Sequence, residues 1–384
     1  MNHYIDGNHI TLLRNGTEFF PALEAAINAA QYEVHVQTYI YAEDETGIRI
    51  GNALKNAAKR GVIVNLMLDG FGSKDLSKGY VQELEEDGVT VLFFRPKISP
   101  WTLKRNRLRR LHRKVSVIDG AVAFVGGINI IDDQNCPGNN APRVDYAVRV
   151  EGMLVSYILG SARSLWRRIS WAHLNPAHSS WVPKPVLPDT SLSMRAMFVV
   201  RDNVLHRRDI EQAYMRLINK ASYEIIIASA YFVPGRKFRQ ALLMASNRGV
   251  KVKLLLQGRM ENMLMIATHA FYSDFLRHGI EIYEYKKSFM HSKVAVVDDQ
   301  WATVGSSNMD PFSLLLAREA NVFVDDKQFA TELRQDLDLA IDQGAVQIRP
   351  EDWEHGHIFK RTLSWVVFSL VRFILGVVGY PKNH

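Results

Sequence analysis

A duplicated motif constrains this chain more than any other feature of its sequence. The segment His112-Arg113-Lys114-Val115-Ser116-Val117-Ile118-Asp119 returns in the second half as His291-Ser292-Lys293-Val294-Ala295-Val296-Val297-Asp298. Each copy has the form His-x-Lys-x4-Asp, and each is followed at a fixed distance by Gly-(Gly/Ser)-x-Asn, which ends at Asn129 and Asn308. One His-x-Lys pair would carry little weight. Two copies that match at the same five positions indicate a duplicated active-site half.

Alternating β-branched residues surround both motifs and predict a strand at each. Side chains alternate between the two faces of a strand, so the histidine and lysine of each copy project from one face. The strands end at the turn pairs Asp119-Gly120 and Asp298-Asp299, and a second apolar segment follows each turn. Each copy is therefore expected to be a hairpin that presents His and Lys together.

The duplication extends beyond the motif, because both halves predict the same order of helices and strands. Gly61 and Gly249 suit helix ends, and the spacing between them is the same as that between Gly70 and Gly258 in the turns that follow. The expected helices cover 18–31, 47–60, 77–87, 236–248 and 268–278, and the expected strands cover 34–40, 62–68, 89–93, 225–232, 250–256 and 280–285. Such alternation predicts an α/β fold, with two tandem αβα sandwich domains related by pseudo-two-fold symmetry. Packing through equivalent faces would bring both motifs to one site.

The length of 384 residues suits two domains and a shorter C-terminal tail. We expect a first domain over 1–174, a linker over 175–194, a second domain over 195–346 and a tail over 347–384. Three prolines break the periodicity within the linker. The single cysteine, Cys136, excludes an intramolecular disulfide and disfavours disulfide-stapled secreted folds. The N-terminus lacks a basic and then apolar leader, so we expect an intracellular protein.

The tail from 358 to 380 is apolar with one polar arc. On a helical wheel the polar arc consists of Arg361, Ser364, Ser369, Arg372 and Gly376. This amphipathic pattern favours a helix that lies in a membrane interface. A helix docked on the protein core is the first alternative. A transmembrane span is the second, and a charge in its middle weakens it.

Positive charge is concentrated directly before the first motif. The net charge of +7 suggests an anionic partner, and eight Lys and Arg residues with no acid lie between Lys97 and Lys114. His112 and His291 are fewer residues apart than the equivalent glycines Gly88 and Gly279. The first half therefore carries extra residues between Gly88 and His112, and these residues are the basic insertion. A solvated loop and a phosphate-collecting rim both fit. The position before His112 favours the rim.

The residue types of the motif suit the cleavage of a phosphodiester. One neutral imidazole can attack phosphorus while the other, protonated, donates to the leaving oxygen, and the lysines can hold the nonbridging oxygens. This scheme needs no metal and no cofactor. The motif residues expected in catalysis are His112, Lys114, Asp119, His291, Lys293 and Asp298, with Asn129, Asn308, Lys114 and Lys293 binding the phosphate. Because Asp119 and Asp298 end strands on turns, we favour a structural role for both.

Each imidazole also needs an acceptor on its other nitrogen to orient it. Two acids lie at similar distances downstream of the histidines, Asp145 after His112 and Glu319 after His291. Both precede strand-like segments. We therefore expect Asp145 and Glu319 to be the orienting acids.

Taken together, the paired motifs resemble those of the phospholipase D superfamily over Asn8 to about Val346. Four further segments resemble the bacterial cardiolipin synthases, in particular their shorter B type: 38–44, 68–73, 290–293 and 308–313. The resemblance implies phosphatidyl transfer between two phosphatidylglycerol molecules through a phosphohistidine, with release of glycerol. It implies anionic phospholipids as partners and a peripheral position on the cytoplasmic face of the bacterial inner membrane. Either histidine can be the nucleophile, and His112 is favoured because some members of the family use the first motif.

Two other functions remain open at this point. A phospholipase D-type phosphodiesterase or nuclease would use the same chemistry on another diester, although an apolar tail favours lipid and nucleic acid is not expected. A non-catalytic lipid-binding scaffold is disfavoured because both His, both Lys and both Asn are present. The sequence does not determine the oligomeric state, the phosphatidyl donor or the ratio of transfer to hydrolysis.

Overall fold

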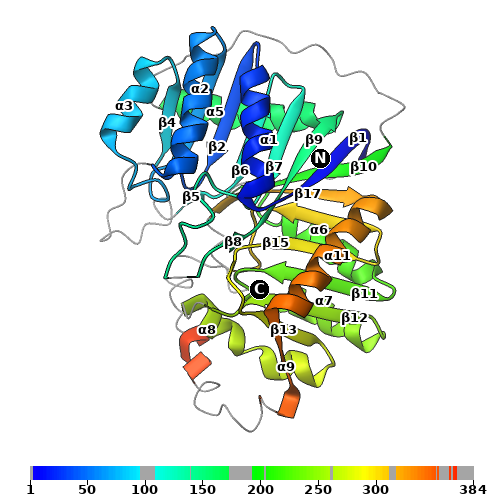
Figure 1. Ribbon diagram of the computed structural model, residues 1–384. Coiled ribbons are helices and arrows are strands. Elements are labelled where there is room, and N and C mark those ends of the chain that lie inside the picture. Colours follow the sequence, from blue (N-terminus) through cyan, green and yellow to red (C-terminus); the bar gives the residue numbers. More distant parts are fainter. Residues whose placement is uncertain are drawn as a thin grey trace.

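The computed structural model describes residues 3–95, 109–138, 140–172, 193–202, 205–259, 263–310 and 317–351, together with 353, 363, 364 and 366–369 (Figure 1). The first half contains β1 (Ile5–Arg14), α1 (Asn15–Ala29), β2 (Glu33–Thr38), α2 (Glu45–Lys59), β3 (Ile63–Asp69), α3 (Lys78–Glu86), β4 (Thr90–Phe94), β5 (Arg110–Leu111), β6 (Lys114–Ile118), β7 (Val122–Gly126), β8 (Arg143–Val144), β9 (Tyr146–Gly152) and α5 (Leu154–Ala172). The second half contains β10 (Met194–Arg201), α6 (Asp209–Lys220), β11 (Glu224–Ser229), α7 (Arg236–Asn247), β12 (Lys251–Gln257), α8 (Met263–His269), α9 (Tyr272–Arg277), β13 (Glu281–Tyr285), β14 (Phe289–Met290), β15 (Lys293–Val297), β16 (Trp301–Gly305), β17 (Ala317–Asp325), α11 (Lys327–Gly344) and β18 (Ala345–Ile348).

The strand order is nearly symmetric about its centre. It runs β18-β13-β12-β11-β15-β16-β17-β10-β1-β9-β7-β6-β2-β3-β4, so equivalent strands of the two halves lie at equal distances from the antiparallel pair β1 and β10. In each half three strands are parallel, β2-β3-β4 and β11-β12-β13, and the motif strand joins them antiparallel. The predicted duplicated α/β fold with pseudo-two-fold symmetry is confirmed.

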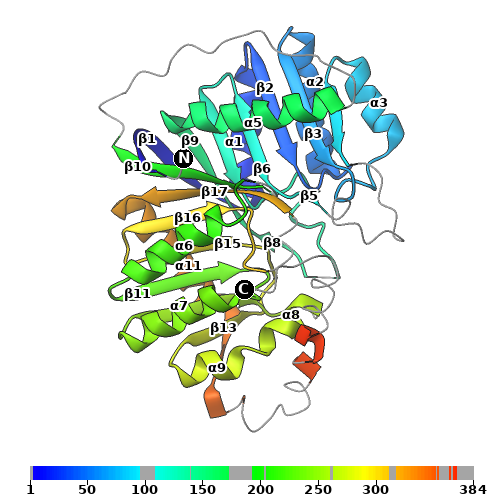
Figure 2. The same cartoon turned by 180° about the vertical axis from the view of Figure 1, so that it is seen from behind.

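Helices cover both faces of each half. Figure 1 shows α1 and α2 in front of the first half-sheet, and Figure 2, the view from behind, shows α5 on the opposite face. In the second half α11 lies in front in Figure 1, while α6 and α7 lie in front in Figure 2. Each half is therefore a three-layer αβα unit, as predicted.

Local sequence signals explain where the helices begin and end. Asp44 caps α2 by accepting a hydrogen bond from the Gly47 amide, and Ser77 and Asp326 cap α3 and α11 in the same way. Gly61 and Gly249 follow α2 and α7 with φ of +88° each, a conformation that favours glycine. These matched ends explain why the glycine spacing revealed the repeat.

The halves meet through their sheets rather than through a linker alone. Strands β16 and β17 contact β7 and β9, and one apolar cluster combines buried residues of both motif strands with residues of α5 and α11. Each half also has an apolar cluster of its own beneath its remaining helices. Burial of this shared apolar surface stabilises the arrangement in which the two motifs come together.

Several predicted elements differ from the structure. The helix expected over 268–278 is two helices, α8 and α9, with a turn at Ala270 and Phe271, where both side chains are buried. The helix expected over 18–31 begins earlier, at Asn15, and ends at Ala29. Most strand ends shift by one or two residues, which is the usual uncertainty of periodicity at element ends.

Three sequence predictions fall largely outside the described residues. These are most of the linker over 175–194, the basic insertion within 96–108, and most of the tail. The described part of the tail packs on the second half: the Phe368 ring centroid lies 4.9 Å from that of Phe271, and Trp353 is buried. Among the described residues, no helix is both long and apolar enough to span a membrane. The domain boundaries and the interfacial helix stay predictions.

Candidate active site

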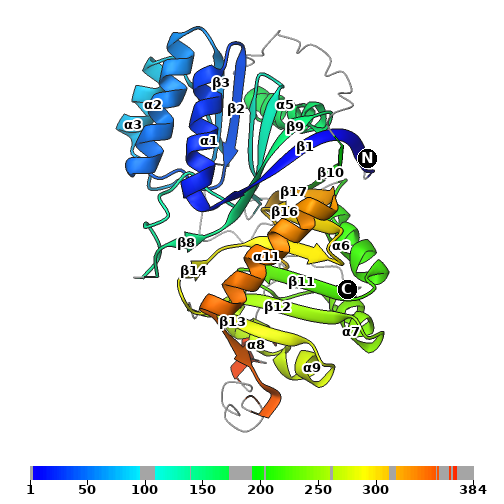
Figure 3. The same ribbon diagram turned by 45° about the vertical axis from the view of Figure 1, so that its right-hand side comes forward.

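Each motif histidine is anchored to the opposite half of the molecule. The His112 amide donates to the Arg318 carbonyl at 3.0 Å, next to the parallel pairing of β5 with β17. The His291 amide donates to the Val144 carbonyl at 2.8 Å, next to the parallel pairing of β14 with β8, which Figure 3 shows side by side. The two motifs therefore contribute to one site at the junction of the halves.

The acids that contact the histidines are exchanged between the halves. Asp145 of the first half lies with Oδ2 2.6 Å from Nδ1 of His291 in the second half. Glu319 of the second half places its carboxylate oxygens 2.9 and 3.1 Å from Nδ1 of His112 in the first. Both predicted acids thus contact imidazole nitrogens, but neither serves the histidine from which its spacing was counted.

The pKa values of both His291 and its partner Asp145 are lowered. Burial and then the ammonium of Lys293 lower the pKa of His291 to about 3, against the opposing effect of Asp145. Burial raises the pKa of Asp145, but Lys293 and His291 outweigh burial and hold it below its ordinary value. At neutral pH the pair is then a carboxylate that accepts the Nδ1 proton of a neutral imidazole, which leaves Nε2 as a base or nucleophile.

The two motif lysines are almost fully buried at the same place. Each Nζ donates to the backbone carbonyl of its own motif histidine, in Lys114 at 2.6 Å. Burial lowers the pKa of Lys114 to about 7 and that of Lys293 to about 8. A nearby carboxylate acts in the opposite direction and raises each pKa, Glu319 for Lys114 and Asp145 for Lys293. A bound phosphate would favour the charged form of both, because an opposite charge at short range stabilises an ammonium.

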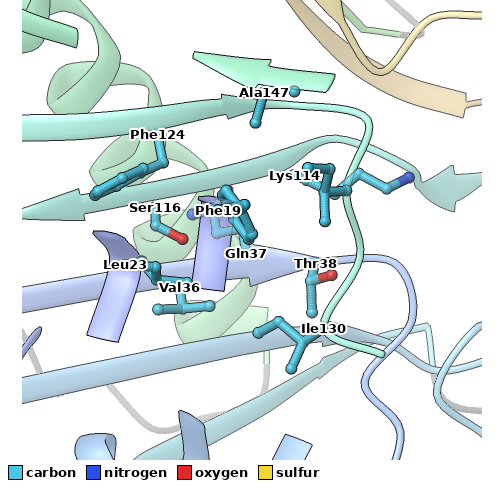
Figure 4. A pocket seen from close by; sticks show the side chains of 12 residues that line it. Phe19, Leu23, Val36, Gln37, Thr38, Lys114, Ser116, Phe124, Ile130 and Ala147 are labelled. Carbon is cyan, nitrogen blue, oxygen red and sulfur yellow. The ribbon is translucent and has the colours of Figure 1, made fainter. Parts of the chain in front are cut away.

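The stem of Lys114 closes a small cavity within the first half. The cavity has a volume of about 10 Å³, enough for roughly one water molecule, and its lining is mostly apolar. Figure 4 shows the amine of Lys114 extending away from the apolar lining residues Phe124, Leu23 and Val36. The cavity is therefore part of the support behind Lys114 and too small for a lipid headgroup.

Sequence reasoning missed two residues that hold the acids. Ser306 donates through Oγ to Glu319 Oε2 at 2.5 Å. At the equivalent position in the first half, a Cβ added to Gly127 would lie 2.2 Å from Asp145 Oδ1, so glycine leaves the space that this carboxylate fills. The Gly-Gly and Gly-Ser pairs of the repeat were the available signal, since they differ at the one position that touches the acids.

The two predicted asparagines are buried but differ in their contacts. Asn129 Oδ1 accepts a hydrogen bond from the Ile40 amide at 3.0 Å, which ties it to the chain after β2. Asn308 Oδ1 is buried and has no hydrogen-bond partner within the described part of the chain. A buried acceptor of this kind is costly unless a ligand or water donates to it, so Asn308 Oδ1 suits a hydroxyl or a water, and only the Nδ2 of Asn308 can donate to a phosphate.

The motif aspartates lie away from the catalytic pairs. Asp119 accepts hydrogen bonds from the amides of Gln31, Tyr32 and Glu33 at 2.7 to 2.8 Å. Asp298 accepts the equivalent three bonds, from the amides of 222–224, at 2.6 to 2.9 Å. Each closes the start of β2 or β11 at the far end of its motif strand, so these contacts agree with a structural role.

Aromatic rings border the histidines, another feature that the sequence did not single out. The Tyr39 ring centroid lies 4.9 Å from that of His112, and Lys114 Nζ lies 5.3 Å from the same Tyr39 centroid. Phe289 stacks on His291 at 5.9 Å between centroids, with 25° between the planes. These rings restrict the orientations of both imidazoles in addition to the carboxylates.

The junction brings together two imidazoles, each with a carboxylate at Nδ1, and two buried lysines, and a buried asparagine follows each motif strand. Such a set can bind a phosphodiester, attack its phosphorus and protonate the leaving oxygen. Within the described ranges no three His, Cys, Asp or Glu side chains come together as candidate metal ligands. The two histidines and two lysines are groups that serve acid-base and nucleophilic phosphoryl chemistry.

Solved structures of other proteins share this fold. The crystal structure of phosphatidylserine synthase from Haemophilus influenzae matches with a TM-score of 0.69 and 13% identity, covering 98% of this chain and 96% of its own. A polyphosphate kinase from Porphyromonas gingivalis matches with a TM-score of 0.56 and 13% identity, covering 96% and 53%. At these identities the likeness establishes the fold, a pair of αβα units in one chain.

Sequence comparisons define the family. Residues 23–140 and 214–340 match the family described as cardiolipin synthase, PLD-like domain. Cardiolipin synthase B of Salmonella typhimurium is 38% identical over 99% of this chain and 91% of its own length, and that of Escherichia coli strain K12 is 36% identical over the same shares. The chain belongs to the cardiolipin synthase family of proteins with phospholipase D-like domains. The predicted family and enzyme class, a phosphatidyltransferase, are confirmed.

Proposed function

We propose that this protein synthesises cardiolipin by transferring the phosphatidyl group of one phosphatidylglycerol to another and releasing glycerol. The single observation that supports the proposal most strongly is the junction of both His-Lys pairs, each with its acid, in a chain that matches cardiolipin synthase B over 91% of that protein's length. Phospholipids as substrates follow from the family. Phosphatidylglycerol as donor and acceptor is the particular choice that we propose.

In the proposed mechanism Lys114 and Lys293 bind the nonbridging oxygens of the donor phosphate, and Asn308 donates to it. One imidazole attacks phosphorus, and the bond to the headgroup glycerol breaks as the second imidazole gives that oxygen a proton. The second imidazole then takes the proton of the acceptor hydroxyl, whose oxygen displaces the first imidazole from phosphorus. These two steps need no reactant other than the donor and acceptor phospholipids.

The role of each histidine is a separate proposal. Sequence reasoning leaves both histidines open and favours His112 as the nucleophile. The low pKa of His291 makes that imidazole neutral at pH 7, which is the form a nucleophile needs. The two assignments predict different sites for the covalent phosphatidyl group, so trapping that group distinguishes them.

We further propose that the protein acts as a peripheral enzyme on the cytoplasmic face of the bacterial inner membrane. The positive net charge and the apolar tail support attachment to an anionic bilayer. Vesicle sedimentation at low and high salt tests this attachment. Retention on anionic but not on neutral vesicles is expected, and binding to neither would contradict it.

Product analysis with phosphatidylglycerol vesicles tests the proposed reaction. The purified protein should form cardiolipin and glycerol in equal amounts. Formation of phosphatidic acid as the main lipid product would instead define a phospholipase D-type hydrolase. Cleavage of soluble diesters or nucleic acid with no reaction on vesicles would favour the alternative phosphodiesterase or nuclease.

A further inference from the structure

Two arginines share one aromatic ring next to His112. The guanidinium carbons of Arg95 and Arg318 lie 5.6 and 5.9 Å from the centroid of Phe94, the last residue of β4. Arg318 is part of β17, and its carbonyl accepts the hydrogen bond of the His112 amide. A ring holds a guanidinium by its face without neutralising the charge, so both cations remain able to attract an anion.

A second ring, shortly after β3, carries two further cations. Arg110 and Lys74 place their charged groups 5.5 and 5.7 Å from the centroid of Phe71, which is 45% exposed. Arg110 also faces Asp69, at 3.7 Å between Nη1 and Oδ1. Arg110 begins β5, two residues before His112, so its side chain projects from the same face as the histidine. We call Arg95, Arg110 and Arg318 the arginine cluster.

Among the described residues whose charges act on Arg95 and Arg318, arginines outnumber acids. Burial, and then the charges of Arg168, Arg109 and Arg95, lower the pKa of Arg318 to about 10, while Asp202 opposes them. Burial also lowers the pKa of Arg95, followed by the charges of Arg109 and Arg110, with Asp69 opposing them. Mutual repulsion among partly buried arginines is relieved when an anion binds between them.

The equivalent place in the second half carries a single arginine on a ring: the Arg143 guanidinium carbon lies 5.8 Å from the centroid of Phe289, and this guanidinium donates to the backbone carbonyls of Asp132 and Asn135. Phe289 occupies the position of Arg110, because each begins the short strand two residues before its histidine. Val144 occupies the position of Arg318, because each precedes the acid that contacts a histidine. Lys286 replaces Arg95 after the equivalent strand, but its Nζ lies 3.3 Å from Glu284. Phosphoryl chemistry shared by both motifs therefore does not require the cluster.

We propose that the arginine cluster binds the phosphate of the second, acceptor phospholipid. The inference rests on the proposed function, because transfer to phosphatidylglycerol brings two phosphodiesters into one site. In the product these phosphates are joined by a single glycerol, so the acceptor phosphate must lie one glycerol away from the reacting phosphorus. The cluster borders the segments that carry His112 and Glu319, because Arg110 lies two residues before His112, Arg318 lies one residue before Glu319, and β5 pairs with β17. Bidentate arginine contacts suit a phosphodiester, which presents two nonbridging oxygens.

A competition between an anionic and a neutral acceptor tests the proposal. Phosphatidylglycerol vesicles with added ethanol yield cardiolipin from the lipid acceptor and phosphatidylethanol from the neutral one. In Arg95→Gln/Arg318→Gln we expect the ratio of cardiolipin to phosphatidylethanol to fall by roughly tenfold or more, as expected for loss of bidentate contacts. The matched control, Lys286→Gln, removes one charge at the equivalent position and should keep the ratio of the unmodified protein.

An unchanged ratio in the double variant would overturn the proposal, because a general effect on membrane attachment lowers both products together. If the unmodified protein releases no glycerol at all, the proposed function fails instead, and the two failures are thereby distinguished. If the double variant releases no glycerol, the same ratio is measured in the milder variant Arg318→Lys. Lysine keeps the charge but not the bidentate geometry, so a lower ratio supports the site and an unchanged ratio contradicts it.

Inorganic phosphate distinguishes the sources of the bound group. Added phosphate lowers the ratio in the unmodified protein if the cluster takes a phosphate group alone, and leaves the ratio unchanged if it requires a lipid headgroup. In either case Arg95→Gln/Arg318→Gln should show no effect of phosphate on the ratio. An effect that persists in this variant would contradict binding at the cluster.

Discussion

The two halves of the site share one motif but differ in the residues around it. His112 lies beside Tyr39 and the arginine cluster, whereas His291 stacks with Phe289 and lies next to Val144. The reacting groups are thus symmetric, and the surroundings that meet the substrate are not. A reaction in which one phospholipid gives its phosphatidyl group and another receives it needs the same difference, because donor and acceptor must be bound in distinct ways.

Removal of either histidine should give the largest effect and tests whether the two halves act as one site. His112→Ala and His291→Ala should each lower kcat/KM by roughly 10⁴-fold or more, because the nucleophile and the acid serve the same displacement. The double variant should be no worse than the more impaired single variant. Effects that multiply would indicate two independent sites, and steady-state glycerol release measures all three.

Substitution of the orienting acids tests the exchange between the halves. Asp145→Asn and Glu319→Gln should each lower kcat by roughly 10²- to 10⁴-fold, because the imidazole loses its preferred tautomer. Nitrogen NMR of labelled histidine provides the sharper comparison. Glu319→Gln should shift the signals of His112 and leave those of His291 nearly unchanged, and Asp145→Asn should do the reverse. Shifts of the histidine in the same half would contradict the crossed contacts.

The residues behind the acids should respond unequally, although they occupy equivalent positions. Gly127→Ser places a side chain where Asp145 Oδ1 lies, so we expect a loss of kcat of about 10²-fold or more. Ser306→Gly only removes one hydrogen bond to Glu319, so we expect a loss of about tenfold. Equal losses would show that the two acids are held alike. Thermal unfolding of both variants serves as the control for folding.

The pH dependence of kcat/KM should reflect the protonation of Lys114 and Lys293. The pKa of about 7 for Lys114 and about 8 for Lys293 means that each is charged below its pKa and neutral above it. Because the charged form binds phosphate, kcat/KM should fall as pH rises from 7 to 9, by up to roughly tenfold per pH unit for each lysine. The parameter kcat should fall less, since bound phosphate keeps the lysines charged. A flat kcat/KM profile over this range would contradict the depressed pKa values.

Much of the fold followed from the sequence because its signals are local. Strand periodicity places His and Lys on one face, and paired glycines mark the ends of α2 and α7 in both halves. The sequence also identified Asp145 and Glu319 as the acids that meet the histidines. Each of these conclusions needs only the spacing of residues within one element or one repeat.

The features that the sequence did not predict depend on how the two halves pack against each other. The exchange of Asp145 and Glu319 follows from β8 pairing with β14 and β5 with β17, which no periodicity reveals. The cluster around Phe94 joins residues from β4 and β17, which belong to different halves of the chain. The break between α8 and α9 likewise arises from burial of Phe271 in the tertiary structure.

Trapping of the covalent intermediate tests the central claim most directly. Phosphatidylglycerol with a labelled phosphate, mixed with the protein and quenched within one turnover, should leave the label on one histidine, His112 or His291. A chase with unlabelled phosphatidylglycerol should move the label into cardiolipin. Label on His291 would assign the nucleophile to the neutral imidazole, and label on His112 would support the sequence hypothesis. Cardiolipin formation with no label on either histidine would contradict the mechanism.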